Sequence, residues 1–246
     1  MAAHPETILI LGGTGEARRL ADELCRRPHT RVVTSLAGRT TEPAKLPGEV
    51  RVGGFGGSQG LSCYLREEKV ALLIDATHPF AATISANAAE ACASLGIPCL
   101  RLERPPWRPL PGDNWREVPD IAHAAATIPA GARALVTVGR QEIAPFLARD
   151  DIRIVARMIE APDAPPPHHA ELLLARPPFT PDDEHRLLRE RQIDILVTKN
   201  AGGTATVAKL MAARGLGLPV IMVARPHKPP VPTAPDVAAI LEMLER

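Results

Sequence analysis

A glycine-rich turn follows the first apolar run of the chain, Thr7–Leu11, and precedes an amphipathic segment. The turn and the start of this segment comprise Gly12, Gly13, Thr14, Gly15 and Glu16. Glycines let backbone N–H groups approach a pyrophosphate, and the positive end of a helix dipole adds to that attraction. The order strand, turn, helix therefore predicts a dinucleotide phosphate site. The spacing departs from G-x-G-x-x-G because Arg18 takes the third glycine's place, and a plain turn without nucleotide is the alternative.

The second apolar run, Arg31–Ser35, indicates which dinucleotide binds. NAD sites usually carry Asp or Glu near the end of this strand, to bind the ribose 2′-hydroxyl. Here no carboxylate appears before Glu42. Ser35 and Arg39 instead offer a hydroxyl and a guanidinium, which suit a 2′-phosphate. The sequence thus favours NADPH, unless Arg39 is only a solvated loop charge.

Two later loops of the first half are expected to reach the same cofactor. Gly54 lies in a glycine-rich loop that can approach a ligand closely, or can be a plain connection. The apolar run ending at Asp75 is followed by Thr77 and His78 and then by a helical pattern, where open α/β sheets bind ligands. Thr77 is expected to cap that helix. His78 can contact the cofactor or donate a proton, although a lone loop histidine is more often structural.

Basic and glycine residues follow several strands of the second half. Arg140, Lys199 and Arg225 each stand at a strand end, so they are expected to converge at one edge of a parallel sheet. Guanidinium, ammonium and backbone amide groups there suit carboxylates or phosphates. The expected substrate-binding set is Arg140, Lys199, Asn200, Gly202, Gly203, Thr204 and Arg225. Each cation taken alone could equally be a solvated surface charge.

Strand-length apolar runs alternate with helical periodicities along most of the chain, which predicts parallel sheets covered on both faces by helices. The 246 residues are enough for two Rossmann-like α/β domains, expected at 1–128 and 129–246. The first is assigned to NADPH and the second to the substrate. Proline-rich residues from 104 onward are interpreted as a connector, with a short helix near 120–127. Whether a terminal strand pairs with the other half's sheet is left open.

The composition excludes several classes of partner. A formal net charge of +1 and 3% aromatic residues argue against nucleic acid, and no apolar run is long enough to span a membrane. The four cysteines lack paired spacing, so neither zinc nor disulfides are expected, and they are interpreted as buried thiols in a reducing cytosol. A cytoplasmic protein with no metal is predicted. Its oligomeric state is open, and a monomer is compatible with the sequence.

Taken together, the motifs resemble the precorrin-6A reductase family of cobalamin biosynthesis. The matching segments are 11–18, 34–39, 51–57, 75–81 and 199–203. Gly15 departs from the family pattern, in which serine is common. The resemblance implies NADPH-dependent reduction of a double bond in precorrin-6A to give precorrin-6B, with hydride delivered to C19 and a proton to C18. The acetate and propionate groups of such a tetrapyrrole agree with the basic strand ends.

The resemblance leaves the proton donor open among His78, Lys199 and a bound water. Some relatives act on the cobalt-bound substrate, and the metal-free substrate is favoured here. The rival of another class is a non-catalytic NADP-binding redox sensor, and a nucleotide-dependent transferase is a further alternative. A short-chain dehydrogenase is excluded because Tyr64 is followed four positions later by Glu68 rather than lysine.

Overall fold

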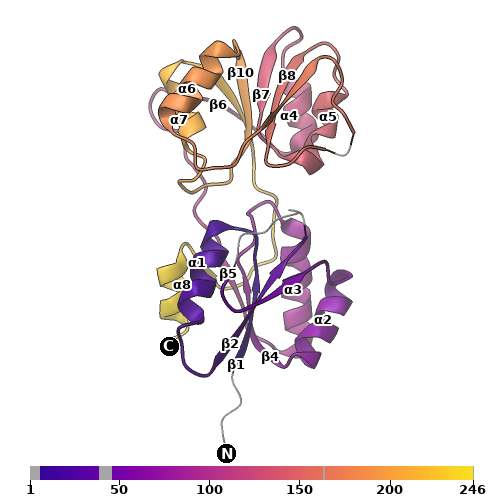
Figure 1. The fold of residues 1–246 in the computed structure, drawn as a ribbon, viewed down its shortest axis with the longest axis vertical. Helices are drawn as coiled ribbons and strands as arrows, with labels where there is room; N and C mark the ends of the chain where they lie inside the picture. Colours follow the sequence, from indigo (N-terminus) through magenta and orange to yellow (C-terminus); the bar gives the residue numbers. More distant parts are fainter. Residues whose placement is uncertain (1–5, 39–45, 163, 246) are drawn as a thin grey trace, which may run out of the picture. The chain divides into compact units, whose positions relative to one another are not determined.

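The computed structural model describes residues 6–38, 46–162 and 164–245. The chain divides into two compact units (Figure 1). The first comprises Met1–Pro105 with His227–Arg246, and the second comprises Pro106–Pro226. The described residues of each unit form a six-stranded parallel sheet flanked by helices. The predicted fold class, two Rossmann-like α/β units, is therefore confirmed.

The first unit has the strand order β12-β5-β4-β1-β2-β3. Its strands are β1 (Glu6–Leu11), β2 (Thr30–Leu36), β3 (Glu49–Val52), β4 (Val70–Asp75), β5 (Cys99–Leu102) and β12 (Thr233–Ala234). Its helices are α1 (Gly15–Leu24), α2 (Gly57–Glu67), α3 (Ala82–Leu95) and α8 (Val237–Met243). Helices α1 and α8 cover one face of the sheet, and α2 and α3 cover the other (Figure 1).

The second unit repeats this arrangement with the strand order β6-β11-β10-β7-β8-β9. Its strands are β6 (Asn114–Val118), β7 (Arg133–Val136), β8 (Arg153–Met158), β9 (Ala170–Leu174), β10 (Ile195–Lys199) and β11 (Pro219–Val223). Its helices are α4 (Ile121–Thr127), the 3-10 turn η1 (Arg140–Glu142), α5 (Ala144–Leu147), α6 (Pro181–Glu190) and α7 (Ala208–Gly215). Helices α6 and α7 pack on one face, with α4 and α5 on the other (Figure 1).

Each sheet has one point where the chain reverses its direction across the sheet. In the first unit the chain runs from β1 outward to β3 and then returns to β4 on the other side of β1. The equivalent point in the second unit lies between β7 and β10. Loops at the carboxyl ends of strands part at such a switch point, which is where open α/β sheets bind ligands. The fold thus selects one candidate site in each unit.

The unit boundaries differ from the expected 1–128 and 129–246. Strand β6 and helix α4 lie before residue 128, yet they belong to the second unit. Strand β12 and helix α8 return to the first unit, where β12 pairs with β5. The possibility left open for a terminal strand is therefore realised. Strand β6 was not predicted because it follows a proline-rich segment. Such a segment is usually a connector or lies at a sheet edge.

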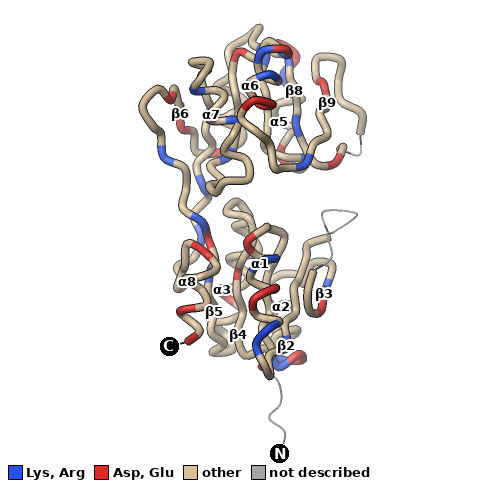
Figure 2. The backbone as a smooth tube through the Cα atoms, turned by 60° about the vertical axis from the view of Figure 1, so that its left-hand side comes forward, with Lys and Arg blue, Asp and Glu red and all other residues tan. Residues whose placement is uncertain are grey.

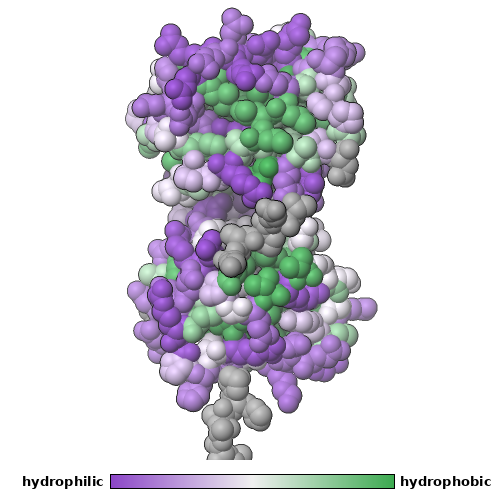
Figure 3. Space-filling view, in the orientation of Figure 1, coloured by the Kyte–Doolittle hydropathy of each residue, from purple (hydrophilic) through white to green (hydrophobic). Residues whose placement is uncertain are grey.

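The central strands are buried on both faces, as their continuous apolar runs predict. Strand β1 is buried from its second residue onward, and β7 and β10 are buried along nearly their whole length. Edge strands carry exposed apolar side chains instead, among them Val50 and Val52 on β3 and Leu174 on β9. Apolar side chains gather on the visible face of each unit, surrounded by hydrophilic ones (Figure 3).

The structure can be compared with what the composition predicted about charge, membrane spans and cysteines. Acidic and basic positions are interspersed over both units (Figure 2), in line with the small net charge. None of the helices in the described parts of the chain has the length and apolarity to cross a membrane. All four cysteines are free thiols, but only Cys92 is buried, so the expectation of four buried cysteines is wrong for the exposed Cys25 and Cys63.

Candidate cofactor and substrate sites

The glycine turn between β1 and α1 has a shape that only glycine adopts freely. Gly13 has a φ of 108°, where a side chain is strained. A Cβ atom on Gly12 would lie 2.8 Å from the Thr34 Cγ2 atom, so the turn lies against β2. Gly15 has open space around its Cα and no left-handed φ, so the serine common in the family would fit there.

Hydrogen bonds hold this turn on both sides. The Gly12 N–H donates to the Ser35 carbonyl of β2 at 2.9 Å. The Thr14 hydroxyl donates to the Ala76 carbonyl after β4 at 2.8 Å and accepts from the Ala17 N–H at 3.0 Å. Thr14 is thus the N-cap of α1 and also a bridge across the switch point. The turn is therefore held by contacts to β2 on one side and to the loop after β4 on the other.

These features fit a dinucleotide pyrophosphate. The first N–H groups of α1 have no acceptor within their own helix, and they lie at its positive dipole end. Glycines at 12 and 13 keep side chains out of the space above them. Glu16 contributes its backbone here, because its carboxylate pairs with Arg104 at 3.0 Å and with Arg19 at 3.8 Å. The cradle is therefore made of backbone rather than of charged side chains.

The carboxyl ends of β2 and β3 place Ser35 beside Arg51, which are partners in the strand register. The Arg51 guanidinium lies 3.4 Å from the Ser35 hydroxyl and donates to the carbonyls of Gly53 and Gly54 at 2.6 and 2.8 Å. It also stacks 3.9 Å from the centre of the Phe55 ring. Gly54 therefore anchors Arg51 through its carbonyl. Sequence reasoning gave Arg51 no role, although its place at a strand end was a usable signal.

Arg39, the residue expected to bind a 2′-phosphate, lies outside the described residues. The described chain before it ends at Gly38, which follows β2 and has a φ of 70°. Ser35 near the end of β2 and Arg51 near the end of β3 are described polar side chains at this edge of the sheet. Arg39 remains a prediction.

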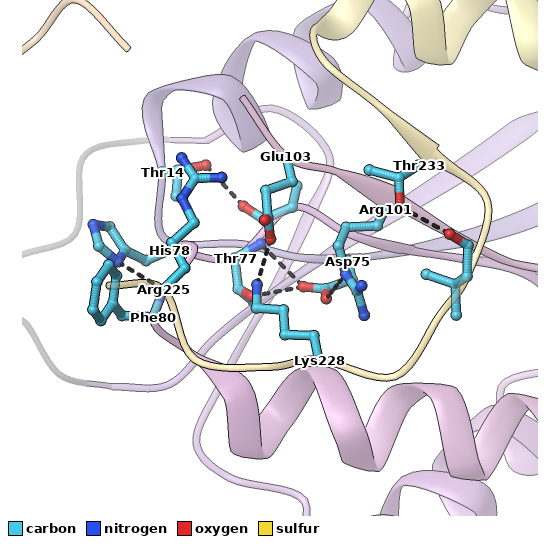
Figure 4. A network of polar contacts seen from close by, with 12 residues as sticks. Thr14, Asp75, Thr77, His78, Phe80, Arg101, Glu103, Arg225, Lys228 and Thr233 are labelled. Atoms are coloured by element: carbon cyan, nitrogen blue, oxygen red, sulfur yellow. Dashed lines mark hydrogen bonds and ion pairs between the residues drawn. The ribbon is translucent and has the colours of Figure 1, made fainter. Parts of the chain in front are cut away.

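The loop after β4 is built on a buried ion pair (Figure 4). The Asp75 carboxylate lies 3.2 Å from Nε of Arg101, and their side chains are only 1% and 8% exposed. The same carboxylate accepts the Thr77 hydroxyl at 2.6 Å and the Thr77 N–H at 3.2 Å. Thr77 therefore does not cap a helix as expected, because Asp75 takes its hydroxyl and α3 begins only at Ala82.

His78 follows this anchored loop, and its ring is oriented by its own backbone. The Phe80 N–H donates to Nδ1 of His78 at 3.2 Å (Figure 4). Nδ1 is then an acceptor, so the proton of the neutral ring lies on Nε2. The ring of His78 is therefore held in one orientation by the loop that follows β4.

In the second unit, Lys199 and Asn200 lie at the carboxyl end of β10, beside the switch point. The Lys199 ammonium pairs with the Glu142 carboxylate in η1, and its side chain is 16% exposed. The Asn200 amide accepts from the Trp107 N–H at 2.8 Å and donates to the Trp107 carbonyl at 3.1 Å. Asn200 thus fixes the connector, whereas Lys199 places a cation at the strand end that is paired with Glu142.

Three more of the predicted residues lie in the loop after β10 or hold it in place. Gly202 and Gly203 have φ values of 69° and 75°, and the Gly203 carbonyl accepts from the Trp107 indole at 2.9 Å. Arg225 donates to the carbonyls of Asn200 and Ala201 at 2.9 and 3.1 Å. Arg225 therefore also holds this loop through backbone carbonyls.

Two predicted positions differ in their surroundings from the expectation. Thr204 is exposed and lies before α7, which begins at Ala208 rather than at residue 204. Its backbone therefore belongs to the loop and not to a helix N-terminus. Arg140 follows β7, and its guanidinium lies 3.9 Å from the Glu160 carboxylate. The second switch point thus brings Arg140 and Lys199 to the carboxyl ends of adjacent strands.

The sequence did not predict a buried cluster of charged residues that lies behind this switch point. Arg157 on β8 donates to Glu184 on α6 at 2.5 Å, with both side chains almost fully buried. Lys209 on α7 is 5% exposed, and its ammonium donates to the Thr137 hydroxyl at 3.2 Å. Burial, with the nearby charges of Arg157 and Lys199, lowers the pKa of Lys209 to about 7, and Glu184 only partly offsets this. Local sequence gave no signal for this cluster, since its members come from separate elements.

Comparison with known proteins covers nearly the whole chain. The model of the family described as precorrin-6x reductase CbiJ/CobK matches residues 7–245. A precorrin-6A reductase of Rhodococcus erythropolis is 50% identical over 236 residues, which are 95% of this chain and 95% of that protein. A cobalt-precorrin-6A reductase of a Synechocystis species is 30% identical and covers 98% of this chain and 96% of its own.

A solved structure gives the same result for the fold. The structure of a CobK precorrin-6A reductase superimposes with a TM-score of 0.92 at 43% sequence identity. The match covers 98% of this chain and 96% of the other. Both units and the returning C-terminal segment are therefore shared with that protein.

Proposed function

This chain belongs to the precorrin-6x reductase family of cobalamin biosynthesis, and from that membership we propose that it reduces a double bond of precorrin-6A with NADPH to give precorrin-6B. The carrying observation is the preformed glycine turn at the first switch point, on a chain whose relatives match it along almost its entire length. A turn fixed on both sides and lined by backbone suits a dinucleotide pyrophosphate.

The residues divide into cofactor and substrate groups. Gly12, Gly13, Thr14, Gly15 and Glu16 would hold the pyrophosphate through the backbone and the α1 N-terminus. Ser35, Arg39 and Gly54 would serve the adenosine end, with Thr77 and His78 nearer the nicotinamide. When bound, NADPH supplies the hydride, and the protein supplies orientation and a proton.

The substrate group lies at the second switch point. Arg140, Lys199, Asn200, Gly202, Gly203, Thr204 and Arg225 would bind the tetrapyrrole carboxylates, with Lys199 as the most direct contact. His78 and Lys199 are the side chains proposed to deliver the proton, with a bound water as the alternative. The metal-free substrate is favoured because the relatives at 46–50% identity are named precorrin-6A reductase and those named for the cobalt form are 30% identical.

The decisive assay mixes the protein with NADPH and precorrin-6A and follows absorbance. Conversion of the macrocycle spectrum with matching NADPH oxidation is expected. Tight NADPH binding without any spectral change would favour the redox-sensor alternative. A parallel reaction with cobalt-precorrin-6A distinguishes the two substrates, and faster turnover of the cobalt form would overturn the metal-free assignment.

Arg39→Ala is expected to weaken NADPH binding by about 10- to 100-fold and NADH binding only slightly, because a charged hydrogen bond to the 2′-phosphate is lost. Dissociation constants for both cofactors give the measurement. Arg51→Ala is the matched comparison, since Arg51 is the described guanidinium near Ser35. Equal losses for NADPH and NADH in Arg39→Ala would refute its 2′-phosphate role, and selective loss in Arg51→Ala would transfer that role to Arg51.

Lys199→Ala is expected to raise the KM for precorrin-6A by about 10- to 100-fold, because a charge-assisted contact to a carboxylate is removed. The dissociation constant of NADPH should stay within about twofold, since Lys199 belongs to the other unit. Arg189→Ala, an exposed cation at the end of α6, is the control and should leave both constants unchanged. A similar KM in Lys199→Ala and the parent protein would place the substrate elsewhere.

A further inference from the structure

Lys209 is a buried cation that has no carboxylate partner in the described parts of the chain. It is the second residue of α7, and its ammonium donates to the Thr137 hydroxyl at 3.2 Å. No ion pair of Lys209 is found among the described residues, and its ammonium lies 5.8 Å from the centre of the Trp107 ring. Desolvation and the positive end of the α7 dipole both oppose a charge at this position. A core position would be filled more stably by an apolar side chain.

Thr137 connects this buried ammonium to the second switch point. Thr137 directly follows β7, and its N–H and hydroxyl bond the Val197 carbonyl of β10 at 3.0 and 3.1 Å. The loop that it begins passes through Gly139, whose φ is 99°, to Arg140. Lys209 therefore lies behind the carboxyl ends of the two strands that carry the proposed substrate-binding cations.

The charges around Lys209 do not cancel. Arg157 on β8, Glu184 on α6 and Lys199 on β10 are the charged groups that act on it, and Thr137 and Trp107 are its neutral neighbours. Arg157 is matched by Glu184 and Lys199 is matched by Glu142. Within this cluster, protonated Lys209 is thus a positive charge in excess. An anion at the strand ends would balance it.

We infer that Lys209 is a positioning residue for the tetrapyrrole: its ammonium, held by Thr137, supplies the excess charge that draws a substrate carboxylate to the ends of β7 and β10. This inference rests on the proposed function, and it adds a pH-dependent component to substrate binding. It also gives a role to a lysine at a position where burial opposes its charge.

The sign of the pH dependence follows from the charge states. With a pKa of about 7 in the free protein, Lys209 is charged below that pH and neutral above it. A bound carboxylate favours the charged form and raises the pKa, so affinity is highest at low pH and falls as the pH rises above about 7. A rise of about one pH unit in this pKa corresponds to about a tenfold change in affinity. Substrate carboxyls titrate near 4.3 and lie below this window.

The test measures the KM for precorrin-6A from about pH 6 to pH 9 in the parent protein and two variants. The parent protein is expected to show a KM that rises about tenfold across this range. Lys209→Met should have a KM that is raised at the low end and flat with pH, with an unchanged dissociation constant for NADPH. Lys228→Met is the matched control, because Lys228 is a buried lysine of the first unit that pairs with Glu103 at 2.7 Å. It should keep the parent pH dependence.

The thermal midpoint separates a structural role from the proposed one. Methionine removes an unfavourable buried charge, so Lys209→Met should melt no lower than the parent protein near pH 7. If Lys209→Met does not fold, Thr137→Val provides the test. Loss of the hydroxyl that accepts from the ammonium should lower the pKa of Lys209, so the rise in KM should occur at lower pH.

Either of two outcomes would count against the inference. A parent-like KM and pH profile in Lys209→Met overturns it, as does an unshifted profile in Thr137→Val. If Lys199→Ala raises KM while Lys209→Met behaves like the parent protein, only this inference fails. If neither variant changes the KM for precorrin-6A, the proposed substrate site fails with it.

Discussion

Asp75→Ala is expected to lower the free energy of unfolding by about 3–5 kcal/mol, because it leaves the Arg101 guanidinium buried without its counter-charge. The two side chains are 1% and 8% exposed, so water cannot replace the lost partner. Thr77 loses the acceptor for its hydroxyl and its N–H at the same time, which frees the loop that carries His78. Equilibrium unfolding in urea, followed by circular dichroism, gives the measurement.

Two controls distinguish the cost of leaving a buried charge unpaired from the cost of removing a side chain. Glu23→Ala breaks the surface pair with Arg26, whose side chains are 45% and 70% exposed, and should cost less than about 1 kcal/mol. The double variant Asp75→Leu with Arg101→Met removes both buried charges and should recover most of the loss. A single Asp75→Ala variant as stable as Glu23→Ala would show that the pair contributes little.

Gly13→Val is expected to weaken NADPH binding by at least about 100-fold. A β-branched residue at a φ of 108° is strained by about 1–3 kcal/mol, and its side chain would also occupy space left for the pyrophosphate. The two effects act together, since relief of the strain would move the N–H groups away from the phosphates. The dissociation constant of NADPH, measured by fluorescence titration, provides the check.

Gly217→Val is the matched control for this backbone strain. Gly217 has a φ of 64° and lies beyond α7 in the second unit, with open space around its Cα. The substitution should lower thermal stability by a similar amount and leave NADPH affinity unchanged. Parent-like NADPH affinity in a folded Gly13→Val protein would place the pyrophosphate away from the glycine turn.

The sequence was sufficient to predict the central strands and missed those at the edges. The sequence has strand-length apolar runs at 8–11, 31–35, 71–75, 98–102, 134–138, 152–158, 193–198 and 219–224. They correspond to β1, β2, β4, β5, β7, β8, β10 and β11, which lie inside the two sheets. The strands not predicted are β3, β6, β9 and β12, and each is a sheet edge. An interior strand must be apolar on both faces, whereas an edge strand is partly solvated and carries a weaker pattern. Polar helices such as α6 were missed for a related reason, although Thr180 and Pro181 signalled its start.

The glycine turn and the strand-end residues were determined by the sequence alone, because their signals are local. Glycines between an apolar run and a helical pattern, and cations that follow an apolar run, are recognised within a few residues. The expected Thr77 cap was wrong, because Asp75 accepts its hydroxyl. Tertiary structure alone decided the return of β12 to the first sheet, the Asp75–Arg101 pair and the position of Lys209 behind Thr137. These depend on contacts between residues far apart in the chain, where the free energy of burying a charge is set by neighbours that local sequence does not specify.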